Sequence, residues 1–398
     1  MPDLDVPDNA TDRQLVPQPS HDFLIVKSRY ENNNRKILIL AASAVFISFV
    51  VFLISYLILL NSKKEVELIT PIPRPGLKTN VPEEIRKVPN PITGELYNED
   101  TVPPWISNRP LGIMINNHPD ARPQSALYQA DIVYEIVAEG GITRFLAFFL
   151  THTPEKIGPV RSAREYYLVL VKELGDAMIM HIGWSPQALV AIESWPVRSL
   201  SRGGATFWRE NPNNVATEHT AYVNGLDLRK RGDELGWEGT RTLTSWKFKD
   251  TKNYAEAKDA WNIFVDFWYK GDFSAIWKYN PDKNTYMRYM GYDASDQPLP
   301  HLDRETKEQI NAENVIVQFA RESSILGDDK NRLEYELLGS GKALVFLDGK
   351  VVEATWNKAG RDERTKFFDM NGEEIEFNRG NFWIEIVPDR NIDQVVFN

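Results

Sequence analysis

Residues Arg109–Leu150 decide how this chain folds, and they read RPLGIMINNHPDARPQSALYQADIVYEIVAEGGITRFLAFFL. Three apolar segments, Leu111–Asn117, Ala130–Glu139 and Arg144–Leu150, are rich in β-branched and aromatic residues, which is typical of buried strands. A Gly-Gly pair separates the last two segments and predicts a two-residue hairpin. The stretch therefore predicts a sheet at the centre of the first globular region.

The segments that follow alternate between helix and strand patterns. Ala163–Leu174 has helical spacing, Ala177–Gly183 reads as a buried strand, and Pro186–Ser194 reads as a short helix. Strands that alternate with helices indicate α/β layers. We therefore expect an α/β-like domain over residues 105–258.

Residues 259–398 consist almost entirely of strand patterns. Asp348-Gly349 and Asn371-Gly372 lie between such patterns and are hairpin signals, because both central residues of the turn need a positive φ. We expect a mainly antiparallel β domain, as a small sheet or barrel, so the fold class is α+β. The candidate strands are Ile263–Tyr269, Phe273–Tyr279, Thr285–Met290, Asn314–Ala320, Lys342–Leu347, Lys350–Trp356, Lys366–Met370, Glu373–Phe377 and Phe382–Val387.

The N-terminal quarter of the chain has a different character. Ile37–Leu60 contains 24 residues without a charge, and at about 1.5 Å per residue it exceeds the ~30 Å hydrocarbon core. It predicts a transmembrane helix, with residues 1–34 as a disordered cytoplasmic tail and the proline-rich residues 61–104 as a stalk. Four basic residues precede the span and two follow it. This difference favours a cytoplasmic N-terminus and extracytoplasmic C-terminal domains.

Composition excludes several functions of the 398-residue chain. The sequence has no cysteine, which rules out disulfides, thiolate metal sites and a cysteine nucleophile. The formal charge of −10 argues against a nucleic-acid partner. We find no zinc-protease motif, phosphate loop or dinucleotide glycine pattern, and so we predict neither a metal nor a cofactor.

Long motifs resemble a known family. Arg109–Leu150 and EKIGPVRSAREYYLVLVKEL (Glu155–Leu174) resemble the N-terminal domain of the YerB-like putative lipoprotein family. NVIVQFA (Asn314–Ala320) and FWIEIVP (Phe382–Pro388) resemble its C-terminal domain. The resemblance implies a two-domain envelope protein with no established reaction. Since this chain lacks the lipid-carrying cysteine, we expect Ile37–Leu60 to replace the lipid anchor.

Two acids and an arginine surround the first predicted hairpin. Glu135 and Glu139 lie four residues apart, so a regular strand places them on one face. With a two-residue turn, Arg144 lies opposite Val137 and within reach of both acids. The pattern predicts either a solvated face with ordinary ion pairs or the wall of a polar pocket.

A second polar group begins the following helix pattern. Ser162 has the capping-box spacing to Glu165, so its simplest role is to cap the helix. Arg161 and Arg164 lie where the helix dipole is positive, which requires an anion. That anion is either one of the two glutamates or a bound phosphate or carboxylate.

Further candidates lie at strand ends, where α/β sites form. His181 ends an apolar strand, and Ser185 before Pro186 has the pattern of a helix cap. Asn116 and Asn117 end another strand, and His219 lies further along the chain. Each histidine has a purely structural, hydrogen-bonded role as its alternative.

Two functional hypotheses and one structural hypothesis follow, and whether the protein is an enzyme stays open. The first is a binding module for a cell-wall glycan, a peptide or an envelope synthesis enzyme. The second is a glycan or peptide hydrolase that uses Glu135 or Glu139 with His181 or His219. In the third, all these charges only pair internally. The predicted ligand-binding residues are Asn116, Asn117, Arg144, Arg161, Ser162, Arg164 and Ser185.

Overall fold

The structure is a computed structural model that describes residues 87–398 apart from 99–103, 251–253, 255 and 268–271. The predicted cytoplasmic tail, the predicted span Ile37–Leu60 and most of the predicted stalk lie outside the described residues. Within the described residues, no helix combines the length and the apolar character needed to cross a membrane.

The last part of the predicted stalk is folded. Strands β1 (Lys87–Pro89) and β2 (Leu96–Asn98) form an antiparallel hairpin. In the turn between them Ile92 joins a hydrophobic core, and the buried Asn90 amide donates to Thr151 Oγ1 at 2.8 Å. The prolines of this segment are compatible with a short edge hairpin. The stalk prediction is therefore wrong for residues 87–98, which form this hairpin.

Half of the strands in the described region belong to one twelve-stranded sheet, here called the large sheet. Its main order is β11-β20-β19-β17-β23-β4-β5-β3-β6-β7, with β18 beside β17 and β21 beside β20. The strands are β3 (Leu111–Asn116), β4 (Ile132–Glu139), β5 (Ile142–Phe149), β6 (Met178–Met180), β7 (Arg198–Ser199), β11 (Lys258–Asp259), β17 (Asn314–Ser324), β18 (Leu333–Glu336), β19 (Gly339–Leu347), β20 (Lys350–Lys358), β21 (Lys366–Asp369) and β23 (Phe382–Pro388).

The remaining described strands form smaller assemblies. A six-stranded antiparallel sheet, here called the small sheet, runs β15-β14-β13-β12-β24 with β16 beside β14. Its strands are β12 (Asn262–Val265), β13 (Ala275–Asn280), β14 (Thr285–Tyr292), β15 (Pro298–Pro300), β16 (Asn311–Ala312) and β24 (Val395–Phe397). Two further pairs are β8 (Trp208–Arg209) with β9 (Ala221–Tyr222), and β10 (Lys247–Phe248) with β22 (Glu376–Phe377).

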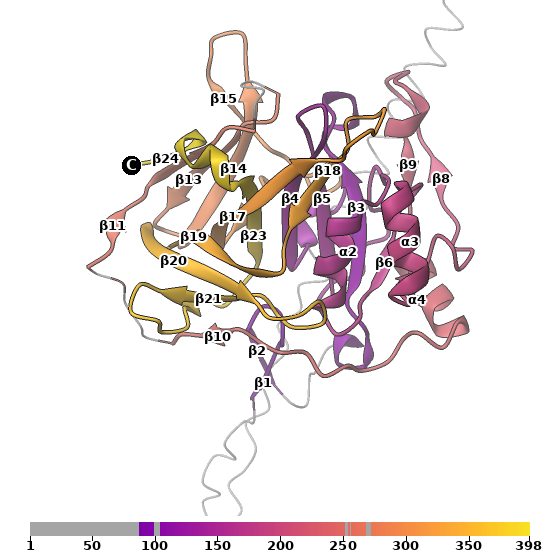
Figure 1. Ribbon diagram of the computed structural model, residues 1–398, viewed down its shortest axis with the longest axis horizontal. Coiled ribbons are helices and arrows are strands. Elements are labelled where there is room, and N and C mark those ends of the chain that lie inside the picture. Colours follow the sequence, from indigo (N-terminus) through magenta and orange to yellow (C-terminus); the bar gives the residue numbers. More distant parts are fainter. Residues whose placement is uncertain (1–86, 99–103, 251–253, 255, 268–271) are drawn as a thin grey trace, which may run out of the picture. The chain divides into compact units, whose positions relative to one another are not determined.

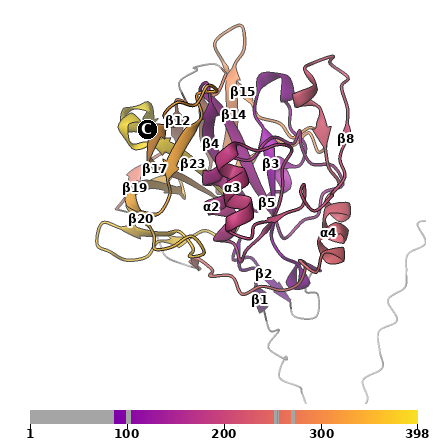
Figure 2. The same cartoon turned by 45° about the vertical axis from the view of Figure 1, so that its right-hand side comes forward.

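Three layers result, with the large sheet in the middle. Helices α2 (Glu165–Lys172) and α3 (Pro186–Ser194) share a hydrophobic core with one face of the large sheet, as Figure 2 shows. The small sheet shares a second core with the other face, to which α4 (Gly225–Glu234) contributes Leu228. The short 3₁₀ helices are η2 (Pro104–Ser107), η3 (Pro119–Ala121), η4 (Leu127–Gln129), η5 (Thr217–His219) and η6 (Asp389–Gln394).

The second predicted region forms the small sheet by itself, but its other long strands belong to the large sheet, which it shares with the first region. Strand β23 pairs in parallel with β17 on one side and with β4 on the other, and Figure 1 shows these strands side by side. Every residue of β23 is buried, which is typical of a strand covered on both faces and paired at both edges. The described region is mostly β, and Pro82–Asn398 forms one compact unit.

A bulge in the first hairpin changes which side chains share a face. Glu139 lies opposite Ile142 as predicted, but β4 carries an extra residue between Val137 and Glu139. Arg144 therefore lies opposite Ile136 instead of Val137. Because a shift of one residue reverses the face, Glu135 points to the side away from Glu139. The expectation that Arg144 reaches both acids is wrong.

Candidate functional site

Glu135 lies sealed between the large and small sheets. Its side chain and that of Arg288, on β14, have no exposed surface and form an ion pair through Glu135 Oε2 and Arg288 Nη2. Thr143 Oγ1 donates to Glu135 Oε1 at 2.7 Å, and Asn117 Nδ2 lies 3.3 Å from the same oxygen. Asn117 and Glu135 therefore work together, but inside the protein core.

The hydrogen bonds around Glu135 continue through two more buried side chains, Gln124 and His301. Gln124 Nε2 donates to Asn117 Oδ1 at 3.0 Å, while Gln124 Oε1 lies 2.8 Å from His301 Nε2. The other nitrogen of His301 lies 2.7 Å from Arg288 Nη1. Burial and the charge of Arg288 lower the pKa of His301 well below its ordinary value. The network thus satisfies most of its own polar atoms, as buried polar groups require, and leaves Arg288 Nε without a hydrogen-bond partner among the described residues.

A second carboxyl group completes this core. Glu385 of β23 lies directly opposite Glu135 in the parallel register, and it accepts from Trp277 Nε1 at 3.0 Å. Burial and the neighbouring Glu135 raise the pKa of Glu385 well above its ordinary value. A protonated Glu385 leaves one carboxylate for one guanidinium. Nothing local in the sequence marks Arg288 or Glu385 as partners of Glu135, since they lie far along the chain.

Unlike Glu135, Glu139 is partly exposed, and it lies at the edge of the opposite face of the large sheet. Arg144 Nη2 lies 2.7 Å from Glu139 Oε2, and Arg164 pairs with Oε1 of the same carboxylate. The two guanidinium groups also donate to the backbone oxygens of Ser162 (3.1 Å) and Ala163 (2.7 Å). Arg144 and Arg164 therefore have an internal anion. Arg161 is paired more loosely, 3.9 Å from Glu218.

Ser162 does not cap a helix. Helix α2 begins only at Glu165, with Arg164 at the cap position and no side-chain cap. Ser162 Oγ donates to the Ile182 carbonyl at 2.8 Å, and Ala163 N donates to Gly183 O. The segment is extended because it pairs with the chain after β6, which overrides the local capping signal. The predicted cap at Ser185 is confirmed, because its Oγ accepts from Ala188 N at 3.1 Å.

His181 has a structural environment. The residue is fully buried, with Nδ1 2.9 Å from Gly183 O and Nε2 2.8 Å from Ser199 Oγ. Burial lowers the pKa of His181 to about 4, so the ring is neutral at neutral pH. It has no contact with Glu135 or Glu139 that would make it their catalytic partner.

His219 stacks on His118 at the surface end of β3. The ring centroids lie 4.4 Å apart, and possible metal ligands of His118, Asp120 and His219 lie within 4.8 Å of one another. Asp120 N donates to His118 Nδ1, and Asn116 Nδ2 lies 2.7 Å from His219 Nδ1 while Asn116 Oδ1 accepts from His118 N. Both rings thus use Nδ1 as an acceptor and keep a proton on Nε2. Neither ring offers a free lone pair, which makes the cluster a poor metal site.

Two of the predicted residues do meet at an open cavity. Arg164 and Ser185 line a space of about 260 Å³ between the helices α2 and α3 and the β17–β18 hairpin, here called the junction cavity. Tyr166, Tyr335 and Leu333 contribute apolar wall. The cavity therefore joins the first predicted region to the second, which sequence reasoning did not anticipate.

The junction cavity contains two glutamates that form no ion pair within the described residues. Glu165 and Glu334 both line it, and burial together with the charge of Glu334 raises the pKa of Glu165 against the opposing influence of Arg361. The cavity's arginines have other carboxylates as partners, since Arg164 pairs with Glu139 and Arg332 pairs with Asp328 at 2.6 Å. The cavity thus favours a ligand that brings a positive charge.

Comparisons with known proteins define the protein family to which the chain belongs. Residues 92–238 match the DUF3048 N-terminal domain and residues 263–384 match the DUF3048 C-terminal domain, both described as a protein of unknown function. The structure joins these two family regions through β4 and β23. The chain belongs to this YerB-like family.

A curated relative and a solved structure support the same family assignment. The chain is 34% identical over 316 residues to "Putative lipoprotein YerB" of Bacillus subtilis (strain 168), which covers 78% of this chain and 90% of that protein. A crystal structure of YerB from Bacillus subtilis has a TM-score of 0.66 and 31% identity, covering 78% of this chain and all of that one.

Proposed function

We propose that the chain is an extracytoplasmic binding protein of the bacterial envelope. Ile37–Leu60 anchors it in the membrane with a cytoplasmic N-terminus, and the described region binds a cell-wall component or an envelope partner in the junction cavity. The name of the Bacillus subtilis relative, a lipoprotein, supports a location at the membrane. The proposed helix then performs the task that a lipid performs in a lipoprotein.

One observation carries the proposal: the junction cavity stays open while the predicted catalytic groups are occupied elsewhere. Arg164 and Ser185 of the predicted set line it, with a polar and apolar wall from both family regions. Binding sites combine an apolar wall with a few polar groups in this way. Because Glu165 and Glu334 repel each other there, a ligand with an ammonium group, such as an amino-bearing stem peptide of the cell wall, suits the cavity.

Hydrolysis has weaker support from the same geometry. Glu135 is sealed at 0% exposure and paired with Arg288, while Glu139 is neutralised by two arginines. His181 is buried, and His219 hydrogen-bonds to Asn116 instead of to either acid. A general acid or base has to reach the atom whose proton it transfers, and these groups do not meet in one cleft.

Retention on purified cell wall tests the proposal. We expect the full chain to bind insoluble peptidoglycan, and Ser323→Trp, which places a large side chain at the cavity wall, to weaken binding about tenfold or more. Ser295→Trp, on an exposed turn away from the cavity, is the matched control and should bind like the parent. Failure of the parent to bind peptidoglycan or membrane extract, or equal binding by Ser323→Trp, would contradict the proposal.

A further inference from the structure

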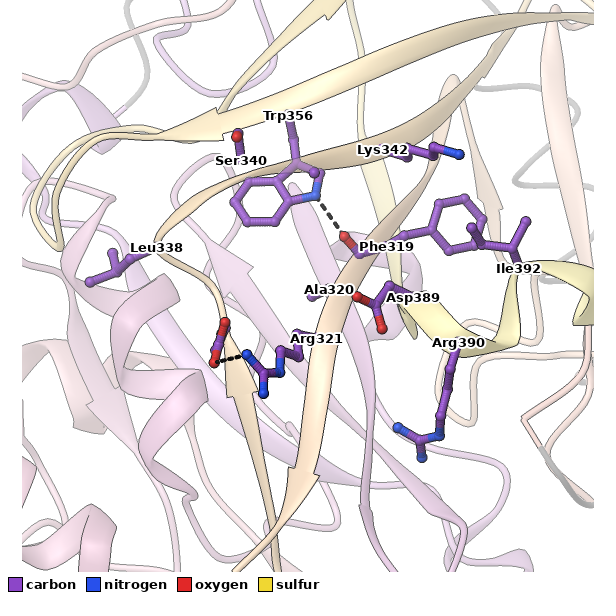
Figure 3. Close-up of a pocket in the computed structure, with 12 residues that line it drawn as sticks. Phe319, Ala320, Arg321, Leu338, Ser340, Lys342, Trp356, Asp389, Arg390 and Ile392 are labelled. Atoms are coloured by element: carbon purple, nitrogen blue, oxygen red, sulfur yellow. Dashed lines mark hydrogen bonds and ion pairs between the residues drawn. The ribbon is translucent and has the colours of Figure 1, made fainter.

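A second pocket lies where β17 separates from its neighbours. Gln318 pairs with Ala343 of β19 and Arg321 pairs with Glu336 of β18. Between these pairs β17 has only two residues, Phe319 and Ala320. The opposite segment, which runs from β18 into β19, has six residues, 337–342. Because it is longer, the 337–342 segment bends away from β17, and a pocket lies in the large sheet at this place, as Figure 3 shows. We call it the detour pocket.

The detour pocket is large enough for a small ligand. Its volume is about 660 Å³, within the range of roughly 300–1,000 Å³ that is usual for ligand sites. Phe319 and Trp356 line it from two different strands, and Leu338 and Ile392 stand at its rim with 47% and 39% of their surfaces exposed. The pocket therefore offers aliphatic surface to whatever enters.

Trp356 shapes the pocket but has little surface for stacking. Its Nε1 donates to the Phe319 carbonyl at 2.7 Å, and only 2% of the residue is exposed. Gly341 permits this position, since a Cβ there would lie 2.6 Å from Trp356 Nε1. Sugar rings bind by covering an exposed aromatic face. The covered indole therefore argues against a glycan in this pocket.

Charged side chains in the pocket fall into two groups. Arg321 pairs with Glu336 at 3.4 Å, and Arg390 pairs with Glu322 at 2.5 Å. Among the described residues, Lys342 of β19 and Asp389 of η6 have no ion-pair partner although both line the pocket. In Figure 3, Lys342 extends from the upper strand and Asp389 reaches in beside Ala320. One ammonium and one carboxylate thus remain available to a ligand.

We propose that the detour pocket binds a short aliphatic peptide with free ends, whose ammonium meets Asp389 and whose carboxylate meets Lys342. Charge-assisted hydrogen bonds of this kind are the stronger ones in proteins and fix orientation. The aliphatic side chains of the ligand lie against the exposed side chains of Leu338 and Ile392. The detour pocket and the junction cavity share Glu336 in their walls, but Lys342 and Asp389 line only the detour pocket, so the proposal does not rest on the proposed function.

Calorimetric titration of the full chain with leucyl-leucine tests this assignment. We expect binding of the free dipeptide and about tenfold weaker binding of its N-acetyl and its amide forms, because each lacks one charge. Di-N-acetylchitobiose is the sugar probe and should not bind. No binding of leucyl-leucine, equal binding of the blocked forms, or competition by the sugar would overturn the proposal.

Variants locate the site. Lys342→Gln and Asp389→Asn should each weaken dipeptide binding about tenfold, whereas Lys330→Gln, an exposed lysine outside the pocket, should have no effect. Ser323→Trp should leave dipeptide binding unchanged, which separates this pocket from the junction cavity. Full affinity in both Lys342→Gln and Asp389→Asn would overturn the assignment.

Discussion

Glu173 and Glu135 are two buried carboxylates of the first family region, and each pairs with positively charged side chains of the second region. The two clusters differ in the number of carboxyl groups for each positive charge. Glu173 accepts from Lys358 Nζ at 2.9 Å and from Arg364 Nη1 at 3.1 Å. Thr365 Oγ1 and Tyr134 Oη donate at 2.6 and 2.7 Å. Here one anion meets two cations. Around Glu135 the proportion is reversed, because the carboxyl groups of Glu135 and Glu385 lie side by side and the one ion pair there joins Glu135 to Arg288.

The difference shows that the count of opposite charges decides how a buried acid titrates. Burial by itself would raise the pKa of Glu173, but Lys358 and Arg364 outweigh burial and lower the pKa to about 2. Burial and a like charge act together on Glu385 and raise its pKa. Both clusters join the two family regions, but they should respond to pH in opposite directions.

The largest effect is expected from Glu173→Gln. The amide cannot balance Lys358 and Arg364, whose side chains have 0% and 2% exposure. Removing one partner of a buried ion pair costs about 3–5 kcal/mol. Urea unfolding at neutral pH should show a fall of this size in the free energy of unfolding.

The same variant tests the acid side of the comparison. The pKa of Glu173 falls from 4.5 to about 2 on folding, so the stabilisation is present above about pH 4.5 and is lost as the pH drops through about 2. The gap between parent and Glu173→Gln should therefore close over this interval. If the difference in unfolding free energy between parent and Glu173→Gln stays constant down to about pH 2, the lowered pKa of Glu173 is contradicted.

Glu385→Gln should have an effect of the opposite sign, which is small near the ordinary pKa of 4.5 and grows as the pH rises. The amide keeps an acceptor for Trp277 Nε1 and mimics the protonated acid. Because the pKa of Glu385 is raised, its contribution is present below the ordinary value of 4.5 and is lost as the pH rises. Each pH unit between the unfolded and folded pKa values costs the parent about 1.4 kcal/mol.

Thermal unfolding across pH checks this second prediction. Parent and Glu385→Gln should have similar stability near pH 4.5, and the variant should gain on the parent as the pH rises. A Glu135→Gln variant is the control, because it removes the ion pair with the buried Arg288 and should be destabilised instead. Equal stability of parent and Glu385→Gln at alkaline pH would contradict a raised pKa.

Glu139→Gln should have the smallest effect, since its ion pairs lie at the edge of the protein. The Glu139 side chain is 19% exposed and its arginine partners are 8% and 11% exposed. Water can replace part of the lost interaction, so we expect a loss of about 1 kcal/mol. Urea unfolding beside Glu173→Gln provides the measurement, and a loss as large as that of Glu173→Gln would remove the distinction between edge and core.

Local patterns predicted the elements well where the sequence carries its own signal. Helix α3 begins after Ser185 as its cap predicts, and Asp348 and Gly349 both have the positive φ of the expected turn. The candidate site was predicted less well. The bulge before Glu139 has no clear local signal, and a one-residue slip was enough to place Glu135 and Glu139 on opposite faces.

By itself the sequence determined the strand and helix periods and the family resemblance, while the apolar anchor stays a prediction. These depend on neighbouring residues and on motifs that can be read along the chain. Only the tertiary structure decided that Arg288 meets Glu135 across 153 positions and that Lys358 meets Glu173 across 185. Such pairs depend on register and on the joining of β4 to β23, because side-chain environment is a property of the assembled sheet and not of the local sequence.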